Sequence, residues 1–146
     1  MHVDGSCHCG KIRYEADINP AHVVVCHCTD CQVLSGTAFR VAVATTEGSF
    51  RLIQGELKTY IKTAESGNAR EQTFCGDCGA PIYSGPLGPQ PKAVSLRVGT
   101  LRQRAELVPS QQFWHRSALP WLPQLASIGT IATQPVFSAS GGFVPD

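Results

Sequence analysis

Seven cysteines carry most of the chemistry in this sequence, and they stand in three short clusters. An odd number of cysteines cannot be fully paired in disulfides, so one thiol would stay free under any pairing. Cysteines at such close spacing can chelate one tetrahedral metal ion from a tight turn. The natural division is four cysteines at one ion and three at another. We refer to the clusters as the first pair (Cys7 and Cys9), the triplet (Cys26, Cys28 and Cys31) and the second pair (Cys75 and Cys78).

The way in which the clusters combine decides what each metal site can do. The second pair belongs to the segment CGDCG, which is typical of a zinc knuckle because its glycines let backbone amides turn toward the sulfurs. Either the first pair or Cys28 and Cys31 could close that site, and spacing alone leaves both combinations open. Four protein ligands make a structural zinc site, whereas three leave a position for water or substrate. If the first pair closes the knuckle, the triplet keeps such a vacant position.

The composition indicates one compact domain around these cysteines. The chain has 146 residues, of which 42% are hydrophobic and 16% charged, and this balance predicts a single domain over residues 1–146. Its cysteines make the expected domain a zinc-binding one. Its formal net charge is +1 without a basic block, which argues against a nucleic-acid partner. We find no apolar signal segment and no run long enough for a membrane span, so we expect a cytoplasmic protein without a membrane partner. Cysteines there bind metal or do chemistry more often than they form disulfides. The sequence predicts no oligomeric state.

Short segments of alternating apolar and polar residues, separated by turn signals, predict a mostly β fold of antiparallel strands. Strands at such regular intervals are typical of a sandwich or barrel. Little helix is expected beyond one turn over Thr29–Leu34, and the stretch Leu119–Gln124 is too rich in proline for regular structure. We expect the tail after Thr130 to be an extended arm or a disordered end. The expected strands are Lys11–Ala16, His22–Cys26, Ala38–Ala44, Ser49–Ile53, Lys58–Lys62, Arg70–Phe74, Pro81–Ser84, Ala93–Val98 and Gln111–His115.

Longer motifs around the cysteines resemble a known family. GSCHCGKIRYE, CHCTDCQVLSGTAFR and FCGDCGAPIYS, in that order along the chain, resemble the glutathione-dependent formaldehyde-activating family. The later segments VGTL and FWHRSALPW look like further parts of the same family. The resemblance covers about residues 5–123 and leaves a C-terminal arm of about residues 124–146. It implies a β-tent fold, in which antiparallel sheets carry zinc knuckles.

The resemblance also implies a cofactor, a reaction and two partners. The cofactor is Zn²⁺, with a structural ion on Cys7, Cys9, Cys75 and Cys78 and a catalytic ion on Cys26, Cys28 and Cys31. The implied enzyme is a carbon–sulfur lyase that condenses glutathione, a small-molecule thiol, with the aldehyde formaldehyde to give S-(hydroxymethyl)glutathione. Zinc on three thiolates has a formal charge of −1 and can exchange its fourth ligand. Zinc also deprotonates a coordinating thiol, and the thiolate is the nucleophilic form.

Two histidines stand between cysteines and are alternative candidates for a fourth ligand. On an extended backbone, neighbouring side chains point to opposite faces. We therefore expect His8 and His27 to support the sites or to lie on the surface rather than to bind metal. His27, His115 and Asp30 are candidates for acid–base chemistry, and the sequence alone assigns that role to none of them.

Positive groups are expected beside a substrate that carries carboxylates, as glutathione does. Arg40 follows the triplet and could bind a carboxylate through two parallel hydrogen bonds, although an exposed strand arginine is the commoner explanation. Phe39 is expected in the core, and Trp114 and Trp121 are expected to pack near a sheet edge. The other available cations are Lys11, Arg13, Arg97 and Arg116.

A non-catalytic alternative also fits the cysteines. A small β domain can gain much of its folding free energy from bound metal, so the chain could be a zinc-stabilised binding or scaffold module. Two further enzyme classes are excluded by their residues. A zinc deaminase needs H-x-E together with P-C-x-x-C, and neither occurs here. A sulfoxide reductase on the same fold would need a free reactive cysteine, and none remains if both clusters hold metal.

Overall fold

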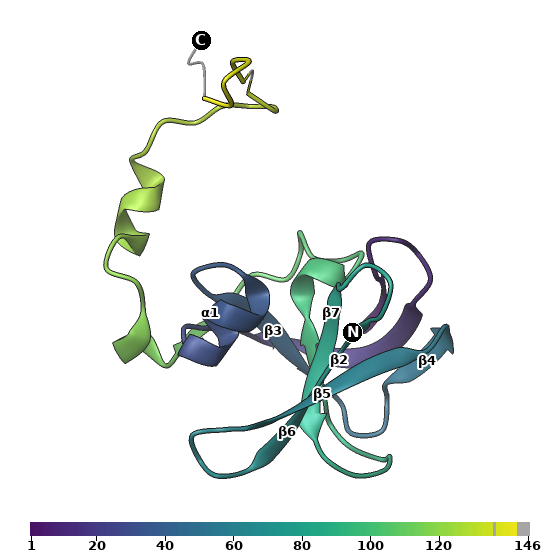
Figure 1. Ribbon diagram of the computed structural model, residues 1–146. Helices are drawn as coiled ribbons and strands as arrows, with labels where there is room; N and C mark the ends of the chain where they lie inside the picture. Colours follow the sequence, from purple (N-terminus) through teal and green to yellow (C-terminus); the bar gives the residue numbers. More distant parts are fainter. Residues whose placement is uncertain (136, 143–146) are drawn as a thin grey trace.

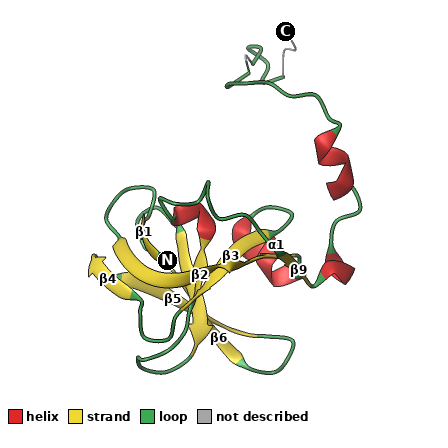
Figure 2. Cartoon of the chain, turned by 180° about the vertical axis from the view of Figure 1, so that it is seen from behind, coloured by secondary structure: helices red, strands yellow, loops and turns green. Residues whose placement is uncertain are grey.

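The protein is built mostly of antiparallel β-strands with little helix, as the sequence predicts (Figures 1 and 2). The computed structural model describes residues 1–135 and 137–142. Within these residues the elements in chain order are β1 (His2–Ser6), β2 (Arg13–Cys26), α1 (Thr29–Ser35), β3 (Arg40–Thr45), β4 (Arg51–Gln54), β5 (Leu57–Thr63), β6 (Ala69–Cys75), β7 (Pro81–Pro86), β8 (Ser95–Arg97), the 3-10 turn η1 (Val98–Thr100), β9 (Gln111–Phe113) and the 3-10 turns η2 (His115–Ser117) and η3 (Leu122–Ala126).

The long strand β2 connects two parts of the sheet. The strand order is β1-β2-β3-β8-β7-β6-β5, and β4 and β9 both pair with β2 outside this path. The first part of β2 pairs with β1 and β4, and its last part pairs with β3 and β9. The pairing with β3 shifts register between Ile18 and Val23, around Pro20, which has no N–H to donate to the ladder. Cys26, at the end of β2, therefore lies between β3 and β9.

The strand predictions are correct in most places and wrong in two. The segments Lys11–Ala16 and His22–Cys26 are parts of the single strand β2, because the irregularity around Pro20 does not end the strand. Strand β1 is absent from the prediction, because Val3 is its only buried side chain and gives no alternating pattern. The helical turn expected over Thr29–Leu34 is α1.

The hydrophobic core includes one cysteine of each pair. Cys7 and Cys75 are both buried in it. The strand β8 joins β3 to β7 across the middle of the sheet, and its Leu96 is completely buried. The other largest buried side chains of the core are Val3, Ile12, Tyr14, Val23, Val43, Ile82, Val94 and Leu101.

The C-terminal segment leaves the sheet after η2 and runs away from it, first as η3 and then as irregular chain (Figure 1). Trp121, Leu125 and Ile128 are exposed along this segment. The described part of the tail after Thr130 consists of bends, a turn and irregular chain without a regular helix or strand. Residues 136 and 143–146 lie outside the described residues, and the expectation of an extended or disordered end stays a prediction. The division between a core of about residues 5–123 and an arm stays a prediction. None of the described helices is long and apolar enough to cross a membrane.

Leu96 tests the importance of the central strand. Leu96→Ala should lower the free energy of unfolding by about 2–5 kcal/mol, because it opens a cavity where β8 joins the two neighbouring strands. Ile61→Ala removes a side chain of β5 that is half exposed, and we expect a change of about 0.5 kcal/mol or less. Urea unfolding at saturating metal measures both values. Equal losses for the two variants would contradict this placement of the core.

Candidate metal centres and the adjoining pockets

The structure brings the cysteines together in two clusters. The ligand atoms of the first and second pairs lie within 4.8 Å of one another, and so do the three sulfurs of the triplet. No other His, Cys, Asp or Glu of residues 1–135 and 137–142 adds a ligand atom to either group. Of the two combinations that the spacing leaves open, the structure has the first pair beside the second pair. We call these groups the four-sulfur cluster and the triplet.

Two matching turns build the four-sulfur cluster. Gly10 and Gly79 each follow a cysteine pair with φ of 78° and 73°, the left-handed conformation that glycine adopts without strain. The N–H of Gly10 donates to the carbonyl of Cys7 (3.1 Å), and the N–H of Gly79 donates to that of Cys75 (2.9 Å). The N–H of Ile12 then donates to the Cys7 sulfur at 3.2 Å. Both turns thus present sulfurs inward with backbone amides beside them.

The sulfur positions fit a tetrahedral zinc ion. The Sγ atoms of Cys7 and Cys9 are 3.5 Å apart, and those of Cys9 and Cys75 are 3.8 Å apart. A tetrahedron with Zn–S bonds of about 2.3 Å has S–S edges of about 3.8 Å. A set of thiolate ligands favours soft metal ions, zinc among them. The four-sulfur cluster could therefore hold one such ion without rearrangement of its backbone.

The triplet sits where β2 ends and α1 begins. Cys26 is the last residue of β2, Cys28 is the N-cap of α1, and Cys31 lies in its first turn. The N–H of Cys31 donates to the Cys28 sulfur at 3.3 Å, so the side chain of Cys28 caps this helix. This connection brings the sulfurs to one side of the chain.

Gln32 holds the loop of the triplet in place. Its side-chain amide donates to the carbonyls of His27 (2.8 Å) and Ser117 (2.9 Å). At the other end of α1, the hydroxyl of Ser35 donates to the carbonyl of Cys31 at 2.6 Å. The triplet is therefore fixed to both its own helix and the chain that follows β9.

The cysteines of each cluster perturb one another's pKa values because their sulfurs are crowded. A hydrogen bond from Cys31 lowers the pKa of the Cys26 thiol to about 5, while the same interaction raises the pKa of Cys31. Hydrogen bonding by the backbone N–H of Ala80 lowers the pKa of the Cys78 thiol to about 6. Within each cluster, some sulfurs are thereby stabilised as thiolates at the expense of others. A bound divalent cation would allow all of them to be thiolates, because metal coordination deprotonates a thiol.

A positively charged cavity of about 340 Å³ opens beside the triplet. We call it the triplet pocket. Cys26 and Cys31 lie on its wall together with Asp30, which forms an ion pair with Lys62. Four cations from four different strands line it, namely Arg40, Lys62, Arg70 and Arg97.

The strand register explains why these cations converge. Arg40 lies opposite Cys26 on the neighbouring strand β3, and Lys62 lies opposite Arg70 in the β5–β6 hairpin. Arg97 lies opposite Ala42, so Arg40 and Arg97 are diagonal neighbours on one face. The expectation that Arg40 is an exposed strand arginine is wrong, since β3 is an inner strand and only 5% of Arg40 is exposed.

The structure brings two of the five cations considered in the sequence into the triplet pocket, and these are Arg40 and Arg97. Lys11 pairs with Asp77 at 2.7 Å, and Arg116 pairs with Glu65 at 2.6 Å. Arg13 lines a different pocket. Sequence reasoning missed Lys62 and Arg70, because their convergence depends on the hairpin pairing and not on distance from the triplet.

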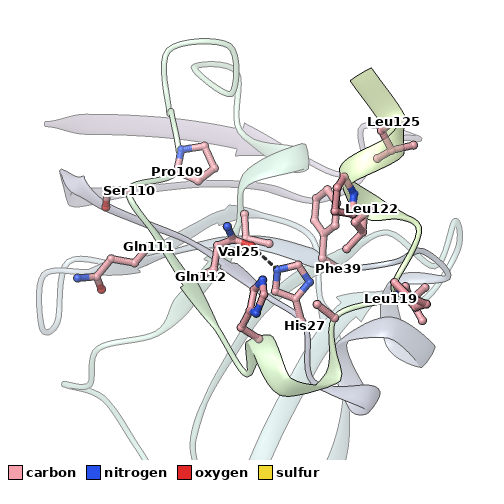
Figure 3. Close-up of a pocket in the computed structure, with 14 residues that line it drawn as sticks. Val25, His27, Phe39, Pro109, Ser110, Gln111, Gln112, Leu119, Leu122 and Leu125 are labelled. Carbon is pink, nitrogen blue, oxygen red and sulfur yellow. Dashed lines mark hydrogen bonds between the residues drawn. The ribbon is translucent and has the colours of Figure 1, made fainter. Parts of the chain in front are cut away.

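A second cavity, of about 740 Å³, lies on the other side of β2 (Figure 3). We call it the imidazole pocket. Val25 and His27 line it, whereas Cys26 between them lines the triplet pocket, as the alternation along a strand requires. His27 is 2% exposed, and its Nε2 lies 2.7 Å from Oε1 of Gln112. The ring of His115 packs edge-on against His27, with centroids 5.6 Å apart.

These positions test the expectations for the remaining candidate residues. Both histidines considered for acid–base chemistry, His27 and His115, line the imidazole pocket, while Asp30 lines the triplet pocket. Phe39, which was expected in the core, is only partly buried and also lines the imidazole pocket. His8 is exposed. Trp114, expected to pack at a sheet edge, is 42% exposed and lies on the wall of the triplet pocket.

Comparisons with known proteins point to a family and a fold. The family model for the glutathione-dependent formaldehyde-activating enzyme matches residues 2–117. An uncharacterized lyase of Schizosaccharomyces pombe is 30% identical over 80 residues, and the match covers 55% of each protein, so the chain spans about half the length of this curated relative. The crystal structure of a Rhodobacter sphaeroides protein matches with a TM-score of 0.57 and 20% identity, covering 75% of this chain and 98% of that one. This last likeness supports the fold alone.

The two clusters predict separate metal losses in cysteine variants. The native chain should hold two zinc ions, and Cys28→Ser should lose one while the protein stays folded, because the triplet lies outside the core. Cys75→Ser should lose the other ion and much of the folded structure, since Cys75 is completely buried. Elemental analysis and circular dichroism measure these outcomes, with His8→Ala as a control that retains both ions. A native chain with one ion and reactive triplet thiols would contradict the two-site assignment.

Proposed function

The chain belongs to the glutathione-dependent formaldehyde-activating enzyme family, and on this basis we propose that it is a zinc-dependent carbon–sulfur lyase/synthase acting on a thiol–aldehyde adduct. The thiol is glutathione or a similar small molecule, and the aldehyde is formaldehyde or a close analogue. The lyase name of the Schizosaccharomyces pombe relative supports the reaction class. A cytoplasmic location suits this chemistry, because thiols stay reduced there.

The difference between the two cysteine groups carries the proposal. The four-sulfur cluster offers a complete tetrahedral ligand set and lies partly in the core, which suits a structural ion. The triplet offers three sulfurs and stands at the wall of a cavity, which suits a catalytic ion. A zinc ion held by Cys26, Cys28 and Cys31 would supply a vacant coordination position and would favour the thiolate form of a substrate thiol.

The residues of the triplet pocket position the substrates and control charge. The thiolate sulfur forms a bond to the carbonyl carbon, the carbonyl π electrons move to oxygen, and the proton lost by the thiol ends on that oxygen. No oxidant or reductant is needed. The cations of the pocket raise the local concentration of an anionic substrate, and its walls hold the sulfur and the carbonyl carbon near each other. His27 and His115 line the imidazole pocket, so neither is placed to exchange a proton with a substrate in the triplet pocket.

The rate of glutathione–formaldehyde condensation tests this function. The zinc-loaded chain should accelerate the formation of S-(hydroxymethyl)glutathione above the spontaneous rate, as measured by exchange NMR at equilibrium. Cys28→Ser should lower the acceleration by about 100-fold or more, because losing even a supporting partner of a metal ligand costs about 10- to 100-fold. The exposed His8→Ala should leave it unchanged.

The same experiment separates the enzyme from a non-catalytic zinc module. If the native chain gives no acceleration and calorimetry detects no glutathione binding, the lyase proposal fails for these substrates. The two metal sites would then serve the stability of a binding or scaffold module.

A further inference from the structure

Two buried arginines in the triplet pocket lack an acidic partner among the described residues. Arg40 is 5% exposed and Arg97 is 7% exposed. Nη2 of Arg97 donates to Oε1 of Gln72 at 2.8 Å, a neutral acceptor. Nη2 of Arg40 and Nε of Arg97 are buried and have no hydrogen-bond partner within residues 1–135 and 137–142. Unused guanidinium donors therefore remain beside this cavity.

Burial of two unpaired cations side by side is energetically costly. A buried charge is normally paired and hydrogen-bonded, and arginine is almost never fully buried without a partner. Burial and the neighbouring Arg40 lower the pKa of Arg97 to about 9. Burial also lowers the pKa of Arg40, although the triplet sulfurs partly offset this effect. Both arginines therefore occupy positions where an apolar side chain would cost less free energy.

The triplet does not neutralise all of the positive charge in the pocket. Lys62 is already paired with Asp30, which leaves the three arginines Arg40, Arg70 and Arg97. Three thiolates on a divalent zinc carry a formal charge of −1, so a net charge of about +2 remains around the cavity. An anionic ligand that enters the pocket would compensate this charge.

Two buried guanidinium groups suit an oxyanion, and a carboxylate is the oxyanion that the proposed class of substrate can carry. Guanidinium groups form parallel pairs of N–H···O bonds with the planar oxygens of a carboxylate. The cavity of about 340 Å³ lies near the lower limit for small-molecule sites. Neutral polar groups at Gln72 and Ser84 and the indole of Trp114 complete its wall. This lining suits a small molecule with an acid group at one end.

We propose that Arg40 and Arg97 form a carboxylate subsite, so that the triplet pocket takes a thiol or aldehyde that carries an acid group. The acid group lies against the two guanidinium groups, and the reactive end lies toward Cys26 and Cys31 on the same cavity wall. This inference rests on the proposed function, because it takes the triplet pocket as the substrate site. Beyond that function, tight binding requires the acid group, and Arg40 and Arg97 are the residues that bind it.

Binding without turnover tests the subsite. The zinc-loaded full chain is titrated by calorimetry with single substrates, comparing 3-mercaptopropionate with 2-mercaptoethanol and glyoxylate with acetaldehyde. The carboxylate-bearing member of at least one pair should bind about tenfold or more tightly than its neutral partner, as expected for a charge-assisted hydrogen-bonded contact. The pair that shows the preference identifies whether the thiol or the aldehyde carries the acid group.

Variants of the two arginines then locate the acid group. Arg97→Met should abolish the preference while affinity for the neutral compounds and zinc content stay unchanged. Arg40→Lys keeps the positive charge but loses the planar guanidinium group, which donates two parallel hydrogen bonds. The preference should therefore become smaller without disappearing. If Arg97→Met does not fold, Arg97→Lys replaces it and should reduce the preference to the same partial extent as Arg40→Lys. Arg102→Met is the matched control, because Arg102 is exposed and pairs with Asp4 away from this pocket.

Each outcome separates the subsite from the lyase proposal. Equal affinities for acidic and neutral compounds in both pairs would overturn the subsite and would leave the condensation activity to be judged by its own assay. A preference that survives Arg97→Met would also overturn it, since the acid group would then be read elsewhere. An Arg97-dependent preference in a chain that does not accelerate the condensation of glutathione with formaldehyde would support the subsite and count against the lyase proposal for these two substrates.

Discussion

Four sulfur atoms from two turns that are distant in the sequence lie within 4.8 Å of one another, and much of the structure depends on this contact. Cys9 and Cys75 are 66 positions apart, so their contact ties the turn between β1 and β2 to the turn between β6 and β7. Thiolates at this distance repel one another unless a cation lies between them. We propose that a zinc ion is this cation and that its binding adds to the free energy of folding. The core then packs around Cys7 and Cys75.

The end of the strand β2 separates the two cavities. Its last residues alternate between two cavities, so that Cys26 faces the triplet pocket while Val25 and His27 face the imidazole pocket. The neighbouring strands β3 and β8 carry Arg40 and Arg97 to the same side as Cys26. The sulfurs of the triplet and the buried cations therefore line one cavity, and the strand separates the histidines from both. The sulfur of Cys26 and the ring of His27 lie on opposite sides of β2 because successive side chains of an extended backbone alternate between its two faces.

The sequence predicts the local features of this arrangement better than the distant ones. Alternation and turn signals are local, so most strands and the turn at α1 are predicted correctly. In the sequence, Pro20 indicates the end of one strand and the start of another. In the structure, β2 is continuous because it pairs with β3 on both sides of this proline. The burial of Arg40 and the convergence of Arg70 and Arg97 depend on which strands become neighbours, and spacing along the chain does not contain that information. The grouping of the cysteines is predicted only in part from the sequence. Spacing leaves two combinations of pairs open, and the folded chain has one of them.

We propose that one metal ion has a complete set of four sulfur ligands and that the other has three sulfur ligands and an open position. X-ray absorption at the zinc edge of the loaded full chain measures the average number of sulfur neighbours per ion. We expect an average midway between three and four, with a lighter nitrogen or oxygen neighbour at about 2.0–2.2 Å for part of the zinc. Four sulfur neighbours at every zinc ion, without a lighter neighbour, would contradict the open site and the chemistry assigned to it.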